Sequence, residues 1–430
     1  MTTYCFLERS IDIMIVRAIV MISVLLAAAQ LLASDWPQYL GPDRNSVSSE
    51  KGLLRSWPPD GPEVLWTVTL GEGFGGPAIS EGKVYTYDRV DDKVNVLRCF
   101  DLMTGNEEWT FSYEAPGSLS WDGSRSVPAI DGNRIYVSDI FGNFHCVDKN
   151  THKALWQKNI WTDFVDAELP KWAIAQNPLV YRNMVIIASQ TQEAGLVAYD
   201  KHNGNIIWKT SKLPGDAGYV SPKTVKIDDE DHLVMISASR YEGSIGAVCG
   251  FDPENGNLLW SYEWKCKTPV PNVTEIGNNQ LFVTGGYGAG GTLIQIEKNG
   301  SSWAVKEIMF SKEFGTHVHP AILYKGHLYS QGTDNQVRNG FMCMDLKGHI
   351  KWKTGRKPGF DKGGFILADD MIISSDGDEM LYLIEPTPTE FKVLAEAELL
   401  DTKQAWAPLA LSDGKLLIRD QKQMKCVLIK

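Results

Sequence analysis

One pattern recurs along this chain: an acidic residue, a turn that ends in glycine, and a tryptophan eight positions after the acidic residue. The clearest copies are Asp101–Trp109, Asp200–Trp208 and Asp252–Trp260, and weaker copies end at Trp156, Trp303 and Trp352. A repeat of roughly 40–50 residues is typical of propellers and solenoids, in which each unit packs against its neighbours. The repeat therefore predicts one large repetitive body rather than several unrelated domains.

The first unit shows what one repeat contains. Short apolar runs at 77–79, 83–87 and 94–100 are separated by turn residues, and the Asp101–Gly105 turn leads into a strand that reaches Trp109. Four short strands joined by hairpins are the composition of one propeller blade. In the turn, an Asp side chain can accept hydrogen bonds from its own backbone, and Gly supplies the positive φ that such a turn needs.

Two independent landmarks give the number of blades. Blade-opening strands follow eight positions, which are Pro77, Pro128, Pro178, Pro222, Pro271, Pro320, Gly364 and Pro408. Closing strands end near seven positions, which are Trp109, Trp156, Trp208, Trp260, Trp303, Trp352 and the run Phe391–Leu394. The segment Val64–Leu70 has the closing pattern but precedes every opening strand, so we expect it to join the C-terminal blade and protect its free edge. The predicted fold is an all-β, eight-bladed β-propeller of four-stranded antiparallel blades, closed into a ring by this N-terminal strand.

The repeat also predicts the place of most tryptophans and cysteines. A large aromatic residue at a fixed position of each blade is expected to fill the seam between neighbouring blades. Cys99, Cys146 and Cys343 stand two residues before the acidic position, where another unit has Ala198. A slot shared by Cys and Ala is small, buried and apolar, and equivalent slots of different blades should lie too far apart for a disulfide. We therefore expect mostly free, buried thiols.

The charge of the chain argues against one class of partner. The formal net charge is -11, and no cluster of Lys and Arg interrupts the sequence. A phosphate-binding surface needs a basic face. We therefore expect no nucleic acid partner.

The N-terminal region divides into two segments. Residues 18–29 form an apolar run between Arg17 and a stretch of small residues, which is the pattern of a secretory signal and is too short to cross a membrane. We interpret residues 1–34 as a signal peptide, with Met14 as an alternative start, and residues 35–63 as an irregular leader before a propeller over 64–430. The mature chain is then exported, to the periplasm or to the extracellular space, and has no transmembrane span.

The units resemble the repeats of pyrroloquinoline quinone (PQQ)-type propellers. The similarity rests on Ala198–Trp208 and Cys99–Trp109, and it extends over about 64–430. The leader Asp35–Asn45 also resembles the start of secreted PQQ-like proteins. The resemblance implies one of two functions. One is a quinoprotein alcohol or sugar dehydrogenase that holds PQQ and calcium on the propeller axis, and the other is a non-catalytic binding propeller such as the BamB subunit of the outer-membrane barrel assembly machinery.

The chain departs from both of these branches. It has no adjacent cysteine pair of the kind whose disulfide packs on the quinone in the alcohol dehydrogenases, and no Cys-x-x-Cys-His haem motif. It also shows no lipid-attachment cysteine, which the barrel-assembly protein usually carries. The leading hypothesis is a non-enzymatic binding or scaffold protein of the cell envelope, with no cofactor expected. The alternative is a dehydrogenase that uses PQQ and calcium.

A binding site is expected at one mouth of the central channel, where the loops that enter the blades meet. Aromatic residues outside the closing-strand position could stack on a flat ligand or a sugar ring, with polar residues beside them to orient it. The alternative is a packed rim that closes the channel. The candidate ligand-binding residues are Trp121, Arg125, Trp172, Gln176, Tyr219, His317, His319, Lys362 and Trp406. The partner would be a small ligand or an envelope protein at this mouth.

Two pairs of residues are weak candidates for metal ligands. His317 and His319 stand two apart, which places both imidazoles on one face of a strand. Asp376 and Asp378 could hold calcium through carboxylate oxygens. The alternatives are a hydrogen-bonded rim for the histidines, which have no identifiable third ligand, and a plain hairpin turn for the aspartates. We expect no bound metal.

Overall fold

The computed structural model describes residues 35–121, 123–165, 168–333 and 338–430. The predicted signal peptide, residues 1–34, lies outside the described residues. Residues 35–430 form one compact unit. In the described part of this unit, strands are joined by turns and loops without a helix. No helix there is long and apolar enough to cross a membrane.

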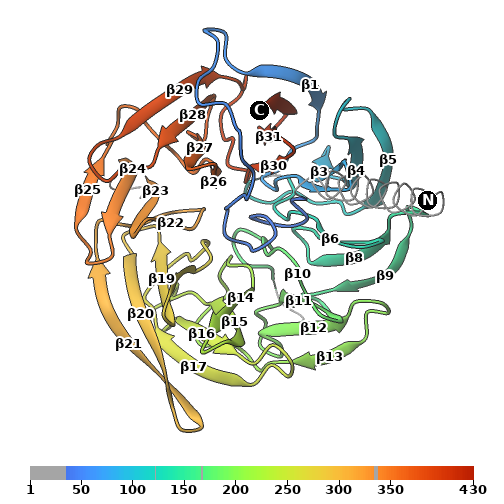
Figure 1. The fold of residues 1–430 in the computed structure, drawn as a ribbon. Helices are drawn as coiled ribbons and strands as arrows, with labels where there is room; N and C mark the ends of the chain where they lie inside the picture. Colours follow the sequence, from blue (N-terminus) through green and yellow to red (C-terminus); the bar gives the residue numbers. More distant parts are fainter. Residues whose placement is uncertain (1–34, 122, 166–167, 334–337) are drawn as a thin grey trace, which may run out of the picture. The chain divides into compact units, whose positions relative to one another are not determined.

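The strands form eight four-stranded antiparallel sheets, arranged as blades in a ring (Figure 1). In blades 1 and 2 the strands are β2 (Ala78–Ser80), β3 (Lys83–Val90), β4 (Val94–Asp101) and β5 (Glu107–Glu114), then β6 (Ala129–Asp131), β7 (Arg134–Ser138), β8 (Asn143–Asp148) and β9 (Ala154–Asn159). In blades 3 and 4 they are β10 (Leu179–Tyr181), β11 (Met184–Ala188), β12 (Leu196–Asp200) and β13 (Ile206–Lys209), then β14 (Lys223–Ile227), β15 (Glu230–Ile236), β16 (Ala247–Phe251) and β17 (Leu258–Glu263).

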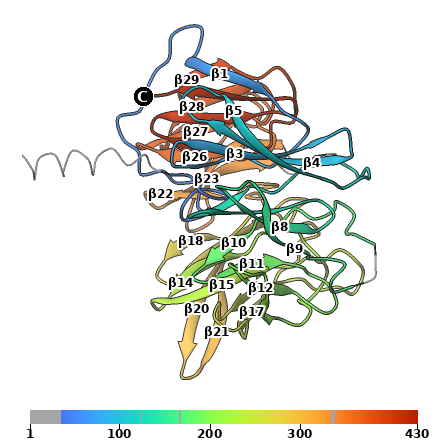
Figure 2. The same ribbon diagram turned by 90° about the vertical axis from the view of Figure 1, so that its right-hand side faces the viewer.

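The second half of the ring follows the same order. Blades 5 and 6 contain β18 (Thr274–Gly277), β19 (Gln280–Gly285), β20 (Gly290–Asn299) and β21 (Ser302–Ser311), then β22 (Ile322–Tyr324), β23 (His327–Thr333), β24 (Arg338–Asp345) and β25 (Ile350–Lys353). Blade 7 contains β26 (Phe365–Ala368), β27 (Met371–Ser375), β28 (Met380–Glu385) and β29 (Lys392–Glu398). The first strand of a blade lies near the centre of the ring and the last at its rim, and the long β20–β21 hairpin projects outward in both views (Figures 1 and 2).

The ring closes through the N-terminal strand, as the sequence predicts. Blade 8 contains β30 (Ala410–Ser412), β31 (Lys415–Arg419) and β32 (Gln423–Leu428), and its outer strand is β1 (Glu63–Thr69). The antiparallel register runs from the Glu63–Leu428 pair to the Thr69–Gln423 pair. The eight-bladed fold, its four-stranded antiparallel blades and its closure by the N-terminal strand are therefore confirmed.

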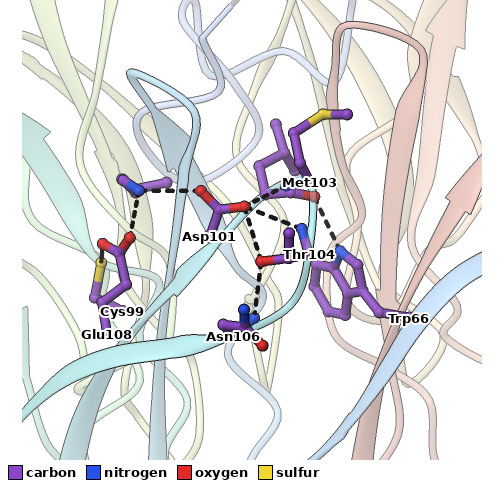
Figure 3. Close-up of polar contacts among 9 residues, drawn as sticks. Trp66, Cys99, Asp101, Met103, Thr104, Asn106 and Glu108 are labelled. Atoms are coloured by element: carbon purple, nitrogen blue, oxygen red, sulfur yellow. Dashed lines mark hydrogen bonds and ion pairs between the residues drawn. The ribbon is translucent and has the colours of Figure 1, made fainter.

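The acidic residue of the repeat shapes the turn before each closing strand. In blade 1, the Asp101 carboxylate accepts hydrogen bonds from the backbone N–H groups of Met103 and Thr104, each over 3.0 Å (Figure 3). The Gly105 N–H donates to the Asp101 carbonyl over 2.9 Å, and Gly105 has a φ of 71°. The side chain thus satisfies the donors of the turn, and glycine closes it in the left-handed region.

The tryptophan of one blade packs on the turn of the next blade. Trp66, from the outer strand of blade 8, donates its indole N–H to the Leu102 carbonyl of blade 1 over 2.9 Å (Figure 3). A Cβ atom added at Gly105 would stand 2.7 Å from the Trp66 ring. Glycine is therefore required in this turn for a second reason, because the ring occupies the space of a side chain.

The same contact recurs in other seams. Trp156 donates to the Lys201 carbonyl and lies against Gly204, and Trp208 donates to the Pro253 carbonyl and lies against Gly256. In blade 2 the glycine position holds His152, whose ring stacks on Trp109 with centroids 4.5 Å apart. Most repeat tryptophans are thus explained as parts of the scaffold, as we expected.

The cysteines are also part of the scaffold. All six cysteines of the described chain are free and buried, in agreement with the prediction. Burial raises the pKa of the Cys99 thiol to about 12, so this thiol stays protonated and unreactive at neutral pH.

The segment Asp35–Ser48, which we call the axial segment, crosses the centre of the ring (Figure 1). Its backbone hydrogen-bonds to the innermost strands of blades 1, 2 and 7, at Ile79, Ile130 and Leu367. The buried Arg44 guanidinium donates to the carbonyls of Pro178 and Asn177 in blade 3, over 2.7 and 3.3 Å. The axial segment is therefore fixed to blades on several sides of the channel.

Two glycine variants test the role of the seam contact. Gly105 and Gly82 have nearly the same φ, 71° and 72°, but an added Cβ meets Trp66 at Gly105 and has no atom within 4 Å at Gly82. Gly82→Ala should cost about 1–2 kcal/mol of unfolding free energy, the strain of a left-handed alanine. Gly105→Ala should cost about 1–3 kcal/mol more, because the ring must also move. Urea unfolding measures both, and equal losses would contradict the seam contact.

Candidate functional site

The predicted mouth residues converge on one cavity. The cavity has a volume of about 310 Å³, and eight of the nine candidate residues line it, which are Trp121, Arg125, Trp172, Tyr219, His317, His319, Lys362 and Trp406. The ninth, Gln176, does not line it. Gln176 is buried beside the cavity, where its amide donates to the Gly218 carbonyl over 3.0 Å and its oxygen accepts from the Ala175 N–H.

The topology of the propeller explains this convergence. The candidate residues lie in the loops that run from the rim of one blade to the innermost strand of the next, for example Trp121 before β6, Lys362 before β26 and Trp406 before β30. These strands all start from the same face of the ring, so the loops that precede them meet around one mouth.

One wall of the cavity is a cluster of three aromatic rings. Phe74 stacks on Trp406 with ring centroids 5.3 Å apart, and Trp121 lies against Trp406 at 5.2 Å. The Lys362 ammonium stands 4.3 Å from the centre of the Trp406 ring, within cation–π range, and its side chain is 11% exposed. The same ammonium pairs with the Asp361 carboxylate over 2.8 Å, so the wall combines apolar rings with a fixed ion pair.

The loop that carries Phe74 is held from both sides. The Phe74 N–H donates to the Ser124 carbonyl over 2.6 Å, which ties the loop to blade 2. From blade 8, the buried Arg419 guanidinium donates to the carbonyls of Gly71 and Gly75. The ring position thus depends on the two blades that flank blade 1.

A second aromatic cluster also lines the cavity. Trp172 lies 5.5 Å from Tyr219 and is stacked at 6.3 Å on Tyr287. The Arg240 guanidinium covers the Trp172 and Tyr219 rings at 5.8 and 5.3 Å and donates to the Tyr219 hydroxyl over 3.1 Å. His317 adjoins this cluster through Tyr287, with centroids 4.8 Å apart.

Backbone strain is present at three lining residues. Trp121, Tyr287 and Lys362 have φ values of 67°, 55° and 66°, in the left-handed region that bulky residues avoid. Such conformations cost about 1–3 kcal/mol each and gather at functional sites, where the surrounding structure holds them. Non-glycine residues in this region of φ also occur in turns elsewhere in the ring, such as those at Asp91 and Asn278.

The two histidines differ in their surroundings. His319 is buried, and its Nε2 atom lies 3.1 Å from the Trp406 carbonyl, so this nitrogen carries the proton and donates it. Burial lowers the pKa of His319 to about 4, which keeps the ring neutral at pH 7. Within the described residues, no group of three or more His, Cys, Asp or Glu side chains is placed to hold a metal ion.

Asp376 and Asp378 belong to the turn between β27 and β28. The Asp376 carboxylate accepts from the backbone N–H groups of Asp378 and Met380, over 2.8 and 3.1 Å. The Asp378 carboxylate accepts from the Gln404 N–H over 3.3 Å. Burial raises the pKa of Asp376 to about 6. These contacts are those of a side-chain-capped hairpin turn.

Two cationic side chains and several hydrogen-bond donors line the cavity. Arg125 and Lys362 belong to this lining, and no described Asp or Glu does. Both cations have protein partners, because Lys362 pairs with the Asp361 carboxylate over 2.8 Å and Arg125 donates to the Ser120 and Trp121 carbonyls. The buried indole N–H of Trp406 has no protein acceptor in the structure, and the Ser221 hydroxyl accepts two hydrogen bonds from Asn177, which leaves its own proton to donate. Although the chain as a whole is acidic, this cavity presents donors and positive charge.

Three aromatic residues are among the lining residues that were not selected from the sequence. Phe74 and Tyr287 lie in glycine-rich loops, where an aromatic residue between glycines is a visible signal. Tyr39 belongs to the axial segment, whose sequence has no periodicity that would place it on the channel.

Comparison with protein families gives one match. Residues 93–354 match the family model described as outer membrane protein assembly factor BamB. This match covers more than half of the chain and lies entirely within the propeller.

Individual relatives share less of their sequence. Quinoprotein alcohol dehydrogenase PedH of Pseudomonas putida is 27% identical over 158 residues, which are 35% of this chain and 24% of the relative. Quinohemoprotein alcohol dehydrogenase of Comamonas testosteroni is 26% identical over 164 residues, 36% of this chain and 22% of the relative. Outer membrane protein assembly factor BamB of Shewanella oneidensis is 25% identical over 164 residues, 38% of this chain and 40% of the relative. The chain thus spans less than half the length of these relatives.

Solved structures share the fold. A europium-containing methanol dehydrogenase superposes with a TM-score of 0.67 at 13% identity, over 90% of this chain and 89% of that chain. Quinohemoprotein alcohol dehydrogenase from Comamonas testosteroni has a TM-score of 0.67 at 14% identity, over 92% and 80%. At such identities the likeness concerns the fold alone.

The burial of His319 predicts a dependence of stability on pH. Its pKa is about 4 in the folded chain and 6.5 when unperturbed, so the unfolded chain takes up the proton first as the pH falls. The contribution of the neutral His319 to the free energy of unfolding is complete above pH 6.5. It is lost as the pH falls toward 4, because the unfolded chain binds the proton and the folded chain does not. His319→Gln, which keeps an N–H donor but does not titrate, should lose roughly 1–2 kcal/mol less unfolding free energy than the parent between pH 7 and 5. Urea unfolding of both proteins at pH 7 and pH 5 tests this. An equal loss of unfolding free energy in the parent and in His319→Gln would contradict a buried neutral His319.

Proposed function

The chain belongs to the PQQ-like propeller family of the outer membrane protein assembly factor BamB, and from that premise we propose that it is a non-enzymatic binding protein of the cell envelope. Its ligand occupies the cavity at the channel mouth. The observation that carries this proposal is the convergence of two aromatic walls and two cationic side chains, Arg125 and Lys362, on one cavity of about 310 Å³.

The composition of the cavity indicates the class of ligand. Flat rings stack on exposed aromatic faces, and Trp121, which is 47% exposed, offers such a face at the mouth. The Lys362 ammonium, which pairs with Asp361 on one side, has three N–H donors and can also bind an anionic group in the cavity. We infer a small, flat ligand that carries a carboxylate or a similar anion.

The dehydrogenase alternative requires PQQ and calcium, and the cavity fits them unequally. A flat, carboxylated quinone suits the aromatic walls and the two cations. Calcium takes six to eight oxygen ligands, usually with several carboxylates, and no described Asp or Glu lines the cavity. The Asn177 amide nitrogen already donates to Ser221, and its oxygen accepts from the Val127 N–H. The described residues do not fit the calcium, and we assign no oxidation step.

The proposed location follows from the sequence and from the names of relatives. The predicted signal peptide directs the chain to the periplasm or beyond. The family model and the Shewanella relative are both named outer membrane protein assembly factors, which supports an envelope protein as a second partner of this chain. Fractionation of cells that produce a C-terminally tagged chain tests export, and a tagged protein of full length in the cytoplasm would contradict it.

Binding of naphthalene-2-carboxylate tests the site. Calorimetry should detect binding to the parent protein, weakened by salt because the contact is ionic. Trp121→Ala should weaken it roughly three- to tenfold through the lost stacking. Lys362→Met should weaken it about tenfold through the lost charge.

The matched control is Lys347→Met, in the exposed turn between β24 and β25, which should leave the affinity unchanged. Equal affinities of all four proteins would place the probe outside the cavity and contradict the proposed site.

PQQ should bind equally well with calcium or with a chelator. Reduction of a dye by an alcohol or a sugar in the presence of PQQ and calcium would contradict the non-enzymatic role and show that the chain is a dehydrogenase.

A further inference from the structure

Tyr39 is the one described lining residue of the cavity that comes from the axial segment. All others follow β1 in the chain. Tyr39 packs in a buried cluster with Leu40, Ala78 and Val127, beside the innermost strands of blades 1 and 2. The N-terminal segment therefore contributes directly to the site.

The contacts of the axial segment place Tyr39 at the inner end of the cavity. The mouth loops precede the innermost strands, whereas the axial segment bonds to residues within those strands, at Ile79, Ile130 and Leu367. On its other side, Arg44 bonds to the Asn177 and Pro178 carbonyls. The segment thus crosses the channel behind the mouth and contributes Tyr39 to the wall of the cavity.

The Tyr39 side chain has a polar group without a protein partner. Tyr39 is 7% exposed and lines the cavity, and none of the hydrogen bonds found among the described residues involves its hydroxyl. Burial raises the pKa of Tyr39 to about 12, against the opposing effect of Arg44, so the hydroxyl keeps its proton at neutral pH. The hydroxyl is not among the fully enclosed polar atoms that lack a partner, so it keeps some accessible surface, and an acceptor on a ligand would add a hydrogen bond there.

Arg44 fixes the ring of Tyr39. Its guanidinium lies 5.7 Å from the ring centre and is anchored to blade 3 by the two carbonyl contacts. Asn177, one of the residues so contacted, also lines the cavity and bonds through its side chain to Val127 and Ser221. The inner end of the cavity is therefore built from hydrogen-bonded parts of blades 2, 3 and 4 together with the axial segment.

We propose that Tyr39 is a ligand-contacting residue and determines specificity at the inner end of the site. Its hydroxyl donates a hydrogen bond to an acceptor at the leading end of the ligand, while the Lys362 ammonium binds the anionic group at the mouth. The site then selects flat ligands with acceptor groups at both ends over ligands with one. This inference rests on the proposed binding function and adds the ligand's second polar group.

Two probes that differ at one end test the hydrogen bond. Naphthalene-2,6-dicarboxylate carries acceptors at both ends and naphthalene-2-carboxylate at one. Tyr39→Phe should weaken the dicarboxylate about tenfold and the monocarboxylate less than twofold, because only the former reaches the hydroxyl. The control Tyr324→Phe removes a hydroxyl that bonds to Asp370 away from the cavity and should change neither. Equal effects of Tyr39→Phe on both probes, or no effect, would overturn the proposal.

A ligand-independent measurement separates this proposal from the proposed function. The six described cysteines are buried, and Cys5 lies outside the described residues. A Cys5→Ser parent should therefore resist 2-sulfonatoethyl methanethiosulfonate, whereas Tyr39→Cys in the same background should be labelled through the mouth. Labelling without binding of either probe would reject the proposed ligand class and retain Tyr39 as part of the cavity wall. A folded Tyr39→Cys protein that is not labelled would overturn the placement of Tyr39, whatever the probes do.

Discussion

The fold depends on the contact between the closing tryptophan of one blade and the turn of the next. The indole N–H reaches a turn carbonyl, as from Trp66 to Leu102, and the ring covers the turn glycine. The contact joins three features of the repeat, because the acidic residue shapes the turn, glycine leaves room, and tryptophan fills it. Since Trp66 belongs to the N-terminal strand, the same contact also seals the ring. A blade is thereby held by its neighbours as well as by its own strands.

A ring fixed in this way can support strained loops at its mouth. Arg419 and Ser124, from the blades on either side, hold the loop that carries Phe74. Trp121 and Lys362 keep left-handed backbone conformations beside it. The rigid seams and the strained mouth are therefore parts of one arrangement, in which the scaffold holds aromatic and cationic groups in place before a ligand arrives.

The sequence predicts the blades better than the site. The number of blades follows from the repeat because each unit has the same local pattern. Ring closure follows because Val64–Leu70 has the pattern of a closing strand but precedes the first opening strand. Most mouth residues were found because topology alone gathers the entering loops. Gln176 points away from the cavity because its amide bonds to a neighbouring loop, and Tyr39 joins the cavity because the axial segment crosses the ring. Both depend on tertiary contacts that no local pattern records.

The central claim is that the mouth cavity is a preformed site for a flat, anionic ligand. A crystal structure of the protein with naphthalene-2,6-dicarboxylate tests it most directly. We predict the ring between the Trp406 and Trp172 walls, one carboxylate near Lys362 and Arg125, and the other toward Tyr39. Dicarboxylate bound elsewhere on the propeller, with the cavity filled by the protein's own side chains, would contradict the account.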